Sequence, residues 1–383
     1  MPSPATHLSE RDRALGLVMR HGRLATAFQI IEPGYTYHFD AGGDAVTAFV
    51  RINRWRVVCG MPVSSVEALP AVVGRFVADC AAQGERVAFF GVEQPLLDAL
   101  ASAGVAADAV QIAEQPEWDP RQYNTRGGAK QTLRGQINRA RNKGVTVRQW
   151  HVAPGDDEAA LRLREAVADV LERWLSSRRM SIMRFMVNLE PFDYPEHRRY
   201  FVAERHGRPI GFLAAVPVPA RGGLFFEDVI RAPEAPNGTA ELLIHTAFES
   251  AAIHGDHYAT LGMAPLAGVP GGAGPHRMIR GVLRLCYARL TPLYAFAGLR
   301  RFKARFHPDG WVPQYLVTCE GKVGVSAFQA VLRAFAGGGL LSFGWDTGRR
   351  LLGRITDRRW RQGLVGLATL LVPWTLLLAS VDG

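Results

Sequence analysis

Cysteine is scarce in this chain, and its four cysteines form no disulfide or metal-ligand pattern. Cys59, Cys80, Cys286 and Cys319 are far apart, no CxxC pair occurs, and each lies in an apolar stretch. Such spacing is typical of buried thiols in a reducing compartment. We therefore expect neither a disulfide nor a structural metal.

Signatures of several common enzyme classes are also missing. The chain has no GxSxG nucleophile elbow, no HExxH zinc motif and no Walker or Rossmann glycine-rich loop, which disfavours the enzymes built on them. His21, His245 and His276 have no neighbours at the spacing of a metal site or a catalytic triad. We interpret these histidines as structural residues.

The N-terminus lacks the positive start and apolar run of a signal peptide, so we expect translation into the cytoplasm. At the other end, residues 363–379 carry no charge and would span roughly 25 Å as a helix, near the minimum for crossing a bilayer. Arginines precede this run, so segment 363–381 is predicted to anchor the protein on the cytoplasmic side of the inner membrane. A buried or interfacial helix is the alternative, because Pro373 interrupts the short run.

Negative charge is the minority: 35 Asp and Glu stand against 45 Lys and Arg, a formal net charge of +10. The excess favours phosphate-bearing partners, whether nucleic acid, anionic lipid or coenzyme. Segment 124–150 has no acidic residue, and a helix is predicted over residues 129–142 with Gly144 ending it. A solvated basic helix is one interpretation, and a docking surface for tRNA or other phosphates is the other. The candidate contacts are Lys130, Arg134, Arg139, Arg141 and Lys143.

One strand, helix, strand unit occurs twice along the chain. Strand-like runs rich in β-branched and aromatic residues flank a stretch with helical spacing in each copy. Antiparallel strand-like segments precede both copies, and the second set turns at His206 and Gly207. The copies comprise residues 56–63, 67–83 and 86–92, and residues 224–230, 239–254 and 258–263.

A meander that feeds one such crossover is the plan of the acyl-CoA N-acyltransferase (GNAT) fold, so an α+β protein with a tandem GNAT-like fold is predicted. Two unrelated α/β domains are the alternative. The predicted units are a first lobe at 1–123, a basic connecting helix at 124–150, a second, catalytic lobe at 151–320, and an amphipathic and apolar C-terminal tail at 321–383.

Four ordered segments carry a resemblance to a known family. They are INRARNKGV at 137–145, the run from Asp228 to Thr239, LGMAPL at 261–266, and 298–315 with RRFKARF and WVPQY. From about His21 to Tyr315 the chain resembles the cytoplasmic catalytic part of the bacterial phosphatidylglycerol lysyltransferases, also called aminoacyl-phosphatidylglycerol synthases. This sequence has no counterpart of their multi-helix transmembrane half.

The resemblance implies an enzyme that takes lysine or alanine from aminoacyl-tRNA and esterifies it to a lipid hydroxyl such as that of phosphatidylglycerol. It implies no cofactor, neither coenzyme A nor metal, with aminoacyl-tRNA as co-substrate. The implied partners are aminoacyl-tRNA, an anionic phospholipid or other lipid acceptor, and the membrane surface. An acyl-CoA-dependent N-acyltransferase and a non-catalytic tRNA- or membrane-binding module are the alternatives.

Asp228 and Arg231 lie where the predicted second-copy strand leaves the sheet. A crossover fold binds its ligand at this point, and the resemblance implies that both residues are catalytic. Asp228 would be the general base or hold the incoming amino group, and Arg231 would bind phosphate or the developing oxyanion. The structural alternative is an i,i+3 salt bridge that closes the loop.

By the same resemblance, Lys303 is the third predicted catalytic residue, as an oxyanion stabiliser. It lies among alternating basic and aromatic residues, which can hold phosphate while their rings pack inward; the structural alternative is a basic strand edge with Phe302 and Phe306 against the core. Nearby arginines are predicted to contact substrate phosphates: Arg300, Arg301 and Arg305.

Two loop segments complete the predicted substrate contacts. Asn237, Gly238 and Thr239 precede the second-copy helix, and Thr239 is expected to cap it. Prolines and an acidic residue replace the glycine-rich pyrophosphate loop of coenzyme A enzymes there, which disfavours coenzyme A. Gly262 and Met263 follow the last strand, in a segment whose small residues permit a ligand to approach closely.

Overall fold

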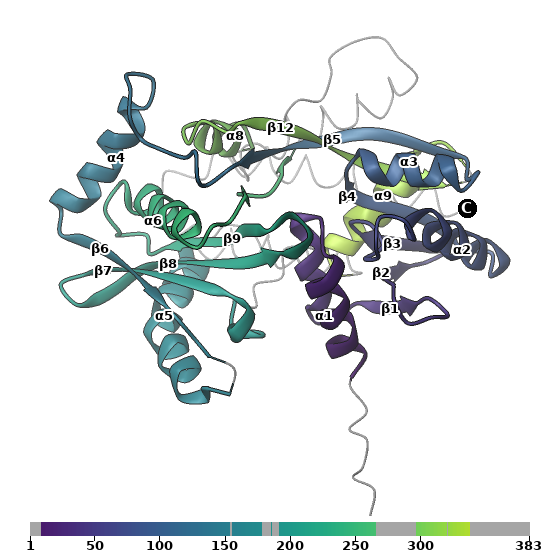
Figure 1. Ribbon diagram of the computed structural model, residues 1–383, viewed down its shortest axis with the longest axis horizontal. Helices are drawn as coiled ribbons and strands as arrows, with labels where there is room; N and C mark the ends of the chain where they lie inside the picture. Colours follow the sequence, from purple (N-terminus) through teal and green to yellow (C-terminus); the bar gives the residue numbers. More distant parts are fainter. Residues whose placement is uncertain are drawn as a thin grey trace, which may run out of the picture.

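The computed structural model describes residues 9–153, 155–177, 185, 191–265, 296–319 and 321–337. Within these residues one mixed sheet runs through the molecule in the order β1-β2-β3-β4-β12-β5-β10-β9-β8-β7-β6, with helices on both of its faces (Figure 1).

The first lobe begins with two helices and a three-stranded meander, and its crossover joins two parallel strands, β3 and β4. Ser9 starts the first helix, because its hydroxyl accepts the amide hydrogen of Asp12. In chain order the elements are α1 (Glu10–His21), the 3₁₀ helix η1 (Ala25–Ile31), β1 (Thr36–Phe39), β2 (Val46–Ile52), β3 (Trp55–Cys59), α2 (Leu69–Ala82), β4 (Arg86–Val92), α3 (Gln94–Ser102) and β5 (Ala107–Trp118).

The second lobe repeats this plan, with α6 as the crossover between the parallel strands β9 and β10. In chain order its elements are α4 (Gln131–Asn142), β6 (Val145–Trp150), α5 (Asp157–Ser177), η2 (Pro195–His197), β7 (Arg199–Arg205), β8 (Arg208–Val218), η3 (Pro219–Arg221), β9 (Gly223–Arg231), α6 (Thr239–Ile253), β10 (Tyr258–Thr260), β11 (Ala264–Pro265), α8 (Phe296–Ala304), β12 (Gly310–Cys319) and α9 (Val325–Phe335).

Each lobe is completed by the last strand of the other. The first lobe's β5 pairs with β10 of the second lobe, and β12 pairs with β4 of the first. Between them, β5 and β12 are antiparallel along the whole of β12. The two lobes therefore share one sheet, and neither has a complete sheet of its own. The predicted tandem GNAT-like fold is confirmed.

The sheet separates four apolar clusters. One lies between α2, α3 and the first lobe's strands, and two lie on opposite faces of the second lobe, against α6 and α5. The fourth joins the lobes, because α1, η1 and α9 pack together with Val216 and Phe225 of the second lobe. In Figure 1, α1 lies between the two lobes. Burying each large side chain of this kind stabilises the fold by about 1.5–3 kcal/mol.

Most predicted elements are confirmed, among them both crossovers, the turn at His206 and Gly207, and the basic helix that ends before Gly144. The alternative of a strand edge at Lys303 is wrong: this segment forms α8, with Phe306 buried just beyond its end. Cys59, Cys80 and Cys319 are buried free thiols, as expected.

Several predictions fall on residues outside those described. These are Cys286, His276 and the C-terminal segment 363–381, so the anchor stays a prediction. Among the residues that the structure describes, no helix is both long and apolar enough to span a bilayer.

Candidate functional site

A β-bulge on β9 brings two acidic side chains to the same face of the sheet. Ala215 of β8 pairs with Phe226, but the next residue, Ala214, pairs with Asp228, so Glu227 is an extra residue on β9. Side chains alternate along a regular strand, and a bulge interrupts that alternation. Glu227 and Asp228 therefore both lie on the face opposite α6.

The bulge lies where β9 loses one of its neighbours. The short strand β10 pairs with β9 only as far as the pair Thr260 and Phe225. The chain then leaves β9, and β11 resumes the pairing with β5 that β10 began. Beyond Phe225, the described strands leave β9 with a partner on its β8 side alone. The two parallel strands of the crossover thus separate at the acidic residues.

A carboxylate from the first lobe completes an acidic cluster, which we define as Glu32, Glu227 and Asp228. Glu32 directly follows η1 and is 2% exposed. The guanidinium of Arg198, also buried, donates to Glu227 Oε2 at 2.5 Å and to the carbonyl of Asp193 at 2.8 Å. Glu32 Oε2 and Glu227 Oε1 are buried and have no hydrogen-bond partner among the described residues.

This cluster places three carboxyl groups beside one guanidinium, that of Arg198, so ionising all three is unfavourable. Burial and the neighbouring Glu227 raise the pKa of Glu32 to about 9, and the same two causes raise the pKa of Asp228 to about 8. Arg198 opposes both shifts. The carboxylate of Asp193 pairs with Arg11 of α1, and Arg198 contacts only the backbone carbonyl of Asp193. A buried site in this condition favours a positively charged ligand.

Arg231 lies on the other face of the same strand. From Asp228 onward the register with β8 is regular, so residues 228 and 231 point to opposite sides of the sheet. The Arg231 guanidinium donates to the carbonyl of Ala235 at 3.3 Å. The alternative of a salt bridge between Asp228 and Arg231 is therefore wrong, and the two do not form one joint site.

Helix α4 covers the start of α6. Gly238 precedes α6 with φ +97°, and a Cβ there would lie 2.0 Å from the carbonyl oxygen of Gln136 on α4. Thr239 is fully buried, and its hydroxyl donates to the carbonyl of Pro236 at 2.7 Å. The expectation that Thr239 caps α6 is wrong, because no side chain caps this helix. Asn237, the third predicted contact here, is exposed.

Lys303 is buried on α8. Its ammonium donates to three successive carbonyl oxygens, those of Leu261, Gly262 and Met263, at 2.7, 2.8 and 2.8 Å. Burial lowers the pKa of Lys303 to about 7. The structure thus brings together three residues that the sequence predicted separately, Lys303 with Gly262 and Met263.

The arginines around Lys303 are engaged with protein groups. Arg300 pairs with Glu114 of β5 at 3.2 Å and lies over the ring of Trp311, and Arg305 pairs with Glu241 in the first turn of α6 at 3.3 Å. Both arginine side chains are about half exposed. Their predicted role in binding phosphate is still a prediction, now with a competing carboxylate at each.

The predicted phosphate contacts on α4 divide into two groups. Arg134 donates to the carbonyls of Thr125 and Gly127, and Lys130 donates to the side chain of Asn124, so both hold the loop before the helix. The second group is exposed and forms no ion pair with a carboxylate of the described residues: Arg139, Arg141 and Lys143.

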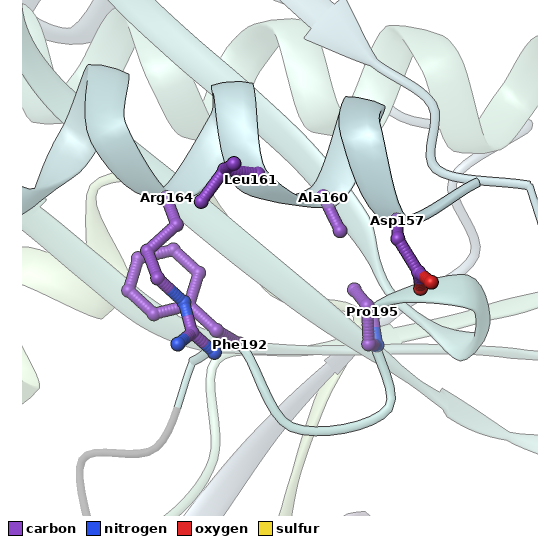
Figure 2. A pocket seen from close by; sticks show the side chains of 6 residues that line it. All are labelled: Asp157, Ala160, Leu161, Arg164, Phe192 and Pro195. Carbon is purple, nitrogen blue, oxygen red and sulfur yellow. The ribbon is translucent and has the colours of Figure 1, made fainter. Parts of the chain in front are cut away.

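A cavity of about 220 Å³ lies between the start of α5 and the turn before β7 (Figure 2). Phe192 lies at one side of it beneath the guanidinium of Arg164, and Asp157 and Pro195 lie at the other. No predicted site residue lines this cavity. Among the described residues, no group of three or more His, Cys, Asp or Glu side chains is arranged to hold a metal ion.

The sequence interpretation missed Glu32, Glu227 and Arg198. Glu227 directly precedes Asp228, but an unbulged strand would place it on the opposite face. Glu32 lies almost 200 residues away in another lobe. Two adjacent acidic residues within an otherwise apolar strand were the only signal of the cluster in the sequence.

The fold and the site define a class of protein: two acyltransferase-like lobes in one sheet, with an acidic cluster where the crossover strands of the second lobe separate. Residues 16–318 match the family described as phosphatidylglycerol lysyltransferase, C-terminal, and the chain belongs to this family of transferases. The resemblance found in the sequence is thereby confirmed.

Three relatives illustrate the match. Phosphatidylglycerol lysyltransferase of Bacillus subtilis is 25% identical over 283 residues, which cover 73% of this chain and 32% of the relative. The C-terminal domain of a protein classed as a lysylphosphatidylglycerol synthetase from Agrobacterium fabrum has a TM-score of 0.71 at 25% identity, over 86% of this chain and 98% of that one. L-PGS from Bacillus licheniformis shares the fold, with a TM-score of 0.69 at 20% identity over 87% and 96% of the two chains. The chain thus spans about a third of the Bacillus subtilis relative.

Proposed function

We propose that this chain transfers an aminoacyl group from tRNA to the hydroxyl of a lipid such as phosphatidylglycerol. The observation that carries the proposal is the acidic cluster at the point where β9 and β10 separate. The names of the relatives supply the lipid, and the cluster supplies a site for the amino group of the donor.

Charge balance favours a lysyl group. When Glu32, Glu227 and Asp228 are all ionised, their three negative charges and the positive charge of Arg198 sum to −2. A lysyl ester carries two ammonium groups and pairs with two ionised carboxyls, whereas an alanyl ester carries one, so that a second carboxyl stays protonated because of its raised pKa and forms no ion pair with the donor. Of the two roles predicted for Asp228, its place in the cluster favours holding the amino group.

The opposite face of the sheet suits the nucleic acid. Arg231 points to the α6 side, where the exposed cations of α4 also lie. We infer that tRNA docks on this basic side and that its aminoacyl end passes between the separating strands to the acidic cluster. The lipid hydroxyl oxygen then forms the new ester bond to the carbonyl carbon, the bond to the ribose oxygen breaks, and the hydroxyl proton ends on that ribose oxygen.

Packing at the start of α6 supports a donor other than acyl-coenzyme A. A GNAT enzyme binds pyrophosphate at the first amides of this helix. Here Gly238 lies directly against Gln136 of α4, so a pyrophosphate would have to displace α4. We therefore propose aminoacyl-tRNA as the co-substrate, without coenzyme A or another cofactor.

Mass spectrometry of lipids tests the function. The chain would be expressed in a bacterium that lacks aminoacylated lipids, beside the variants Asp228→Asn and Asp44→Asn. The second is a matched control, because Asp44 is an exposed aspartate of the first lobe. A lipid heavier by one lysyl residue, present with the chain and the control but absent with Asp228→Asn, is expected. An unchanged lipid profile with folded protein at the membrane would contradict the proposal.

A further inference from the structure

The Lys303 ammonium has no N–H left over. An ammonium has three donors, and here each meets a backbone carbonyl at 2.7–2.8 Å. The residue is 5% exposed. In this arrangement Lys303 has no free donor to direct at a reacting carbonyl group.

The three carbonyls need this partner because of where they lie. Residues 261–263 lie between Thr260, the last residue of β10 that pairs with β9, and Ala264, the first residue of β11. They pair with neither β9 nor β5, although β10 and β11 on either side of them both pair with β5. A buried carbonyl without a partner costs about 1–3 kcal/mol, so a single ammonium that satisfies three in succession stabilises an otherwise unfavourable turn.

The turn is held tightly against β9. Gly262 has φ +70°, and a Cβ there would lie 2.7 Å from the ring of Phe225. The amide of Gly262 donates to the hydroxyl of Thr260 at 3.0 Å, and that hydroxyl donates to the carbonyl of Pro116 on β5 at 2.7 Å. The chain is thereby directed away from β9 directly beside the bulge, while it stays next to β5.

We propose that Lys303 is a positioning residue: its ammonium gathers the carbonyls of residues 261–263 and so keeps the chain that follows β10 apart from β9. The part of β9 that bears Glu227 and Asp228 then stays accessible from the β10 side. Lys303 acts through the backbone and does not touch the aminoacyl group. Its effect on transfer rests on the proposed function, but its effect on the strands does not.

Chemical rescue tests the role. Lys303→Ala is expected to lose about a hundredfold in transfer rate and to show faster hydrogen exchange at the amides of 226–231. Ethylammonium should restore both, and 2-fluoroethylammonium, which is similar in size but more acidic, should restore both equally. Rescue that instead follows the acidity of the amine would show proton donation or oxyanion stabilisation by Lys303, and would overturn the proposal.

Two further variants keep the test decisive. Lys303→Met retains most of the stem without the charge, so it replaces the alanine variant if that one does not fold, with the same faster exchange expected. Exposed Lys322→Ala is the matched control and should exchange as wild type does. If the wild-type chain transfers nothing to lipid while ethylammonium still slows exchange in Lys303→Ala, the proposed function fails and the positioning role stands. If the amides of residues 226–231 exchanged at the wild-type rate in both Lys303 variants, the positioning role would be overturned.

Discussion

The two lobes share one crossover unit but treat its two parallel strands differently. In the first lobe, β3 pairs with β4 along its whole length, from Trp55 to Cys59. In the second, β10 pairs with only three residues of β9, and a bulge follows where the pairing ends. The two lobes also differ in the charge that these strands carry. β9 carries Glu227 and Asp228, whereas β3 ends in Val58 and Cys59, which are both buried and uncharged in the folded protein.

This difference shows that the crossover unit determines the fold of each lobe but does not by itself create the candidate site. The site depends on two local departures from regular structure, the extra residue on β9 and the early end of β10. The first lobe has neither departure, but it is not a passive copy. It supplies Glu32, so the second lobe's site is incomplete without it.

The largest expected effect comes from removing the first lobe's contribution to the acidic cluster. Glu32→Gln removes the first lobe's only carboxylate in the cluster while keeping its shape. Losing one buried charge partner of a bound ammonium costs about 3 kcal/mol, so kcat/KM for lysyl transfer should fall roughly a hundredfold. Steady-state transfer with lysyl-tRNA and phosphatidylglycerol vesicles measures the effect.

The matched control is Glu67→Gln, an exposed glutamate of the first lobe. The Glu32 variant should also bind lysine amide more weakly than wild type does, while its affinity for alanine amide changes less. Equal losses for the two amides would contradict the assignment of Glu32 to a second ammonium.

The pH dependence of stability should report the same cluster. The folded-state pKa values of Glu32 and Asp228 are raised to about 9 and about 8, so the folded protein holds more protons than the unfolded chain above pH 4. This contribution to stability is complete below about pH 4, and it is lost progressively as the pH rises from there to the folded pKa values of about 8 and about 9. With these pKa values the free energy of unfolding should fall by several kcal/mol, on the order of 6 kcal/mol, between pH 6 and pH 9.

Urea unfolding at several pH values measures this fall, and Glu32→Gln should flatten it. Saturating lysine amide should flatten it as well, because a bound cation stabilises the ionised carboxyls in the folded state. A fall of the same size in Glu32→Gln and wild type would place its origin outside the cluster.

The sequence predicted what local pattern determines. The repeats, the turn at His206 and the basic helix follow from periodicity and from turn and stop signals within short windows, and Asp228 was found because it ends a recognisable strand. The exchange of β5 and β12 between lobes could not be predicted, since it depends on pairing between segments about 200 residues apart.

The composition of the site was hidden for the same reason. A one-residue bulge decides whether Glu227 lies beside Asp228 or across the sheet from it, and no local signal fixed that bulge. Lys303 was found by resemblance, but its partners are backbone carbonyls, which carry no side-chain signature in a sequence.

The smallest expected effect concerns the basic face, where the second lobe carries α4. Its exposed cations, Arg139, Arg141 and Lys143, lie in water and bind phosphate by screened attraction, so each contributes little at physiological salt. Replacing all three by alanine should weaken tRNA binding by about threefold to tenfold. The slope of log Kd against log salt should fall by about 0.7–0.9 for each phosphate that is no longer neutralised. Lysine amide binding should not change, because the acidic cluster lies on the other face.

The control for the basic face is a variant of the first lobe that removes the same net charge from exposed positions. It replaces Arg20, Arg51 and Arg75 by alanine. Titrating tRNA into both variants at several salt concentrations separates two origins of the affinity. An equal loss in the control would mean that net charge alone draws the tRNA, because the removed charges would then act wherever they lie. A loss confined to the α4 variant would locate the docking of tRNA on the basic face of the second lobe.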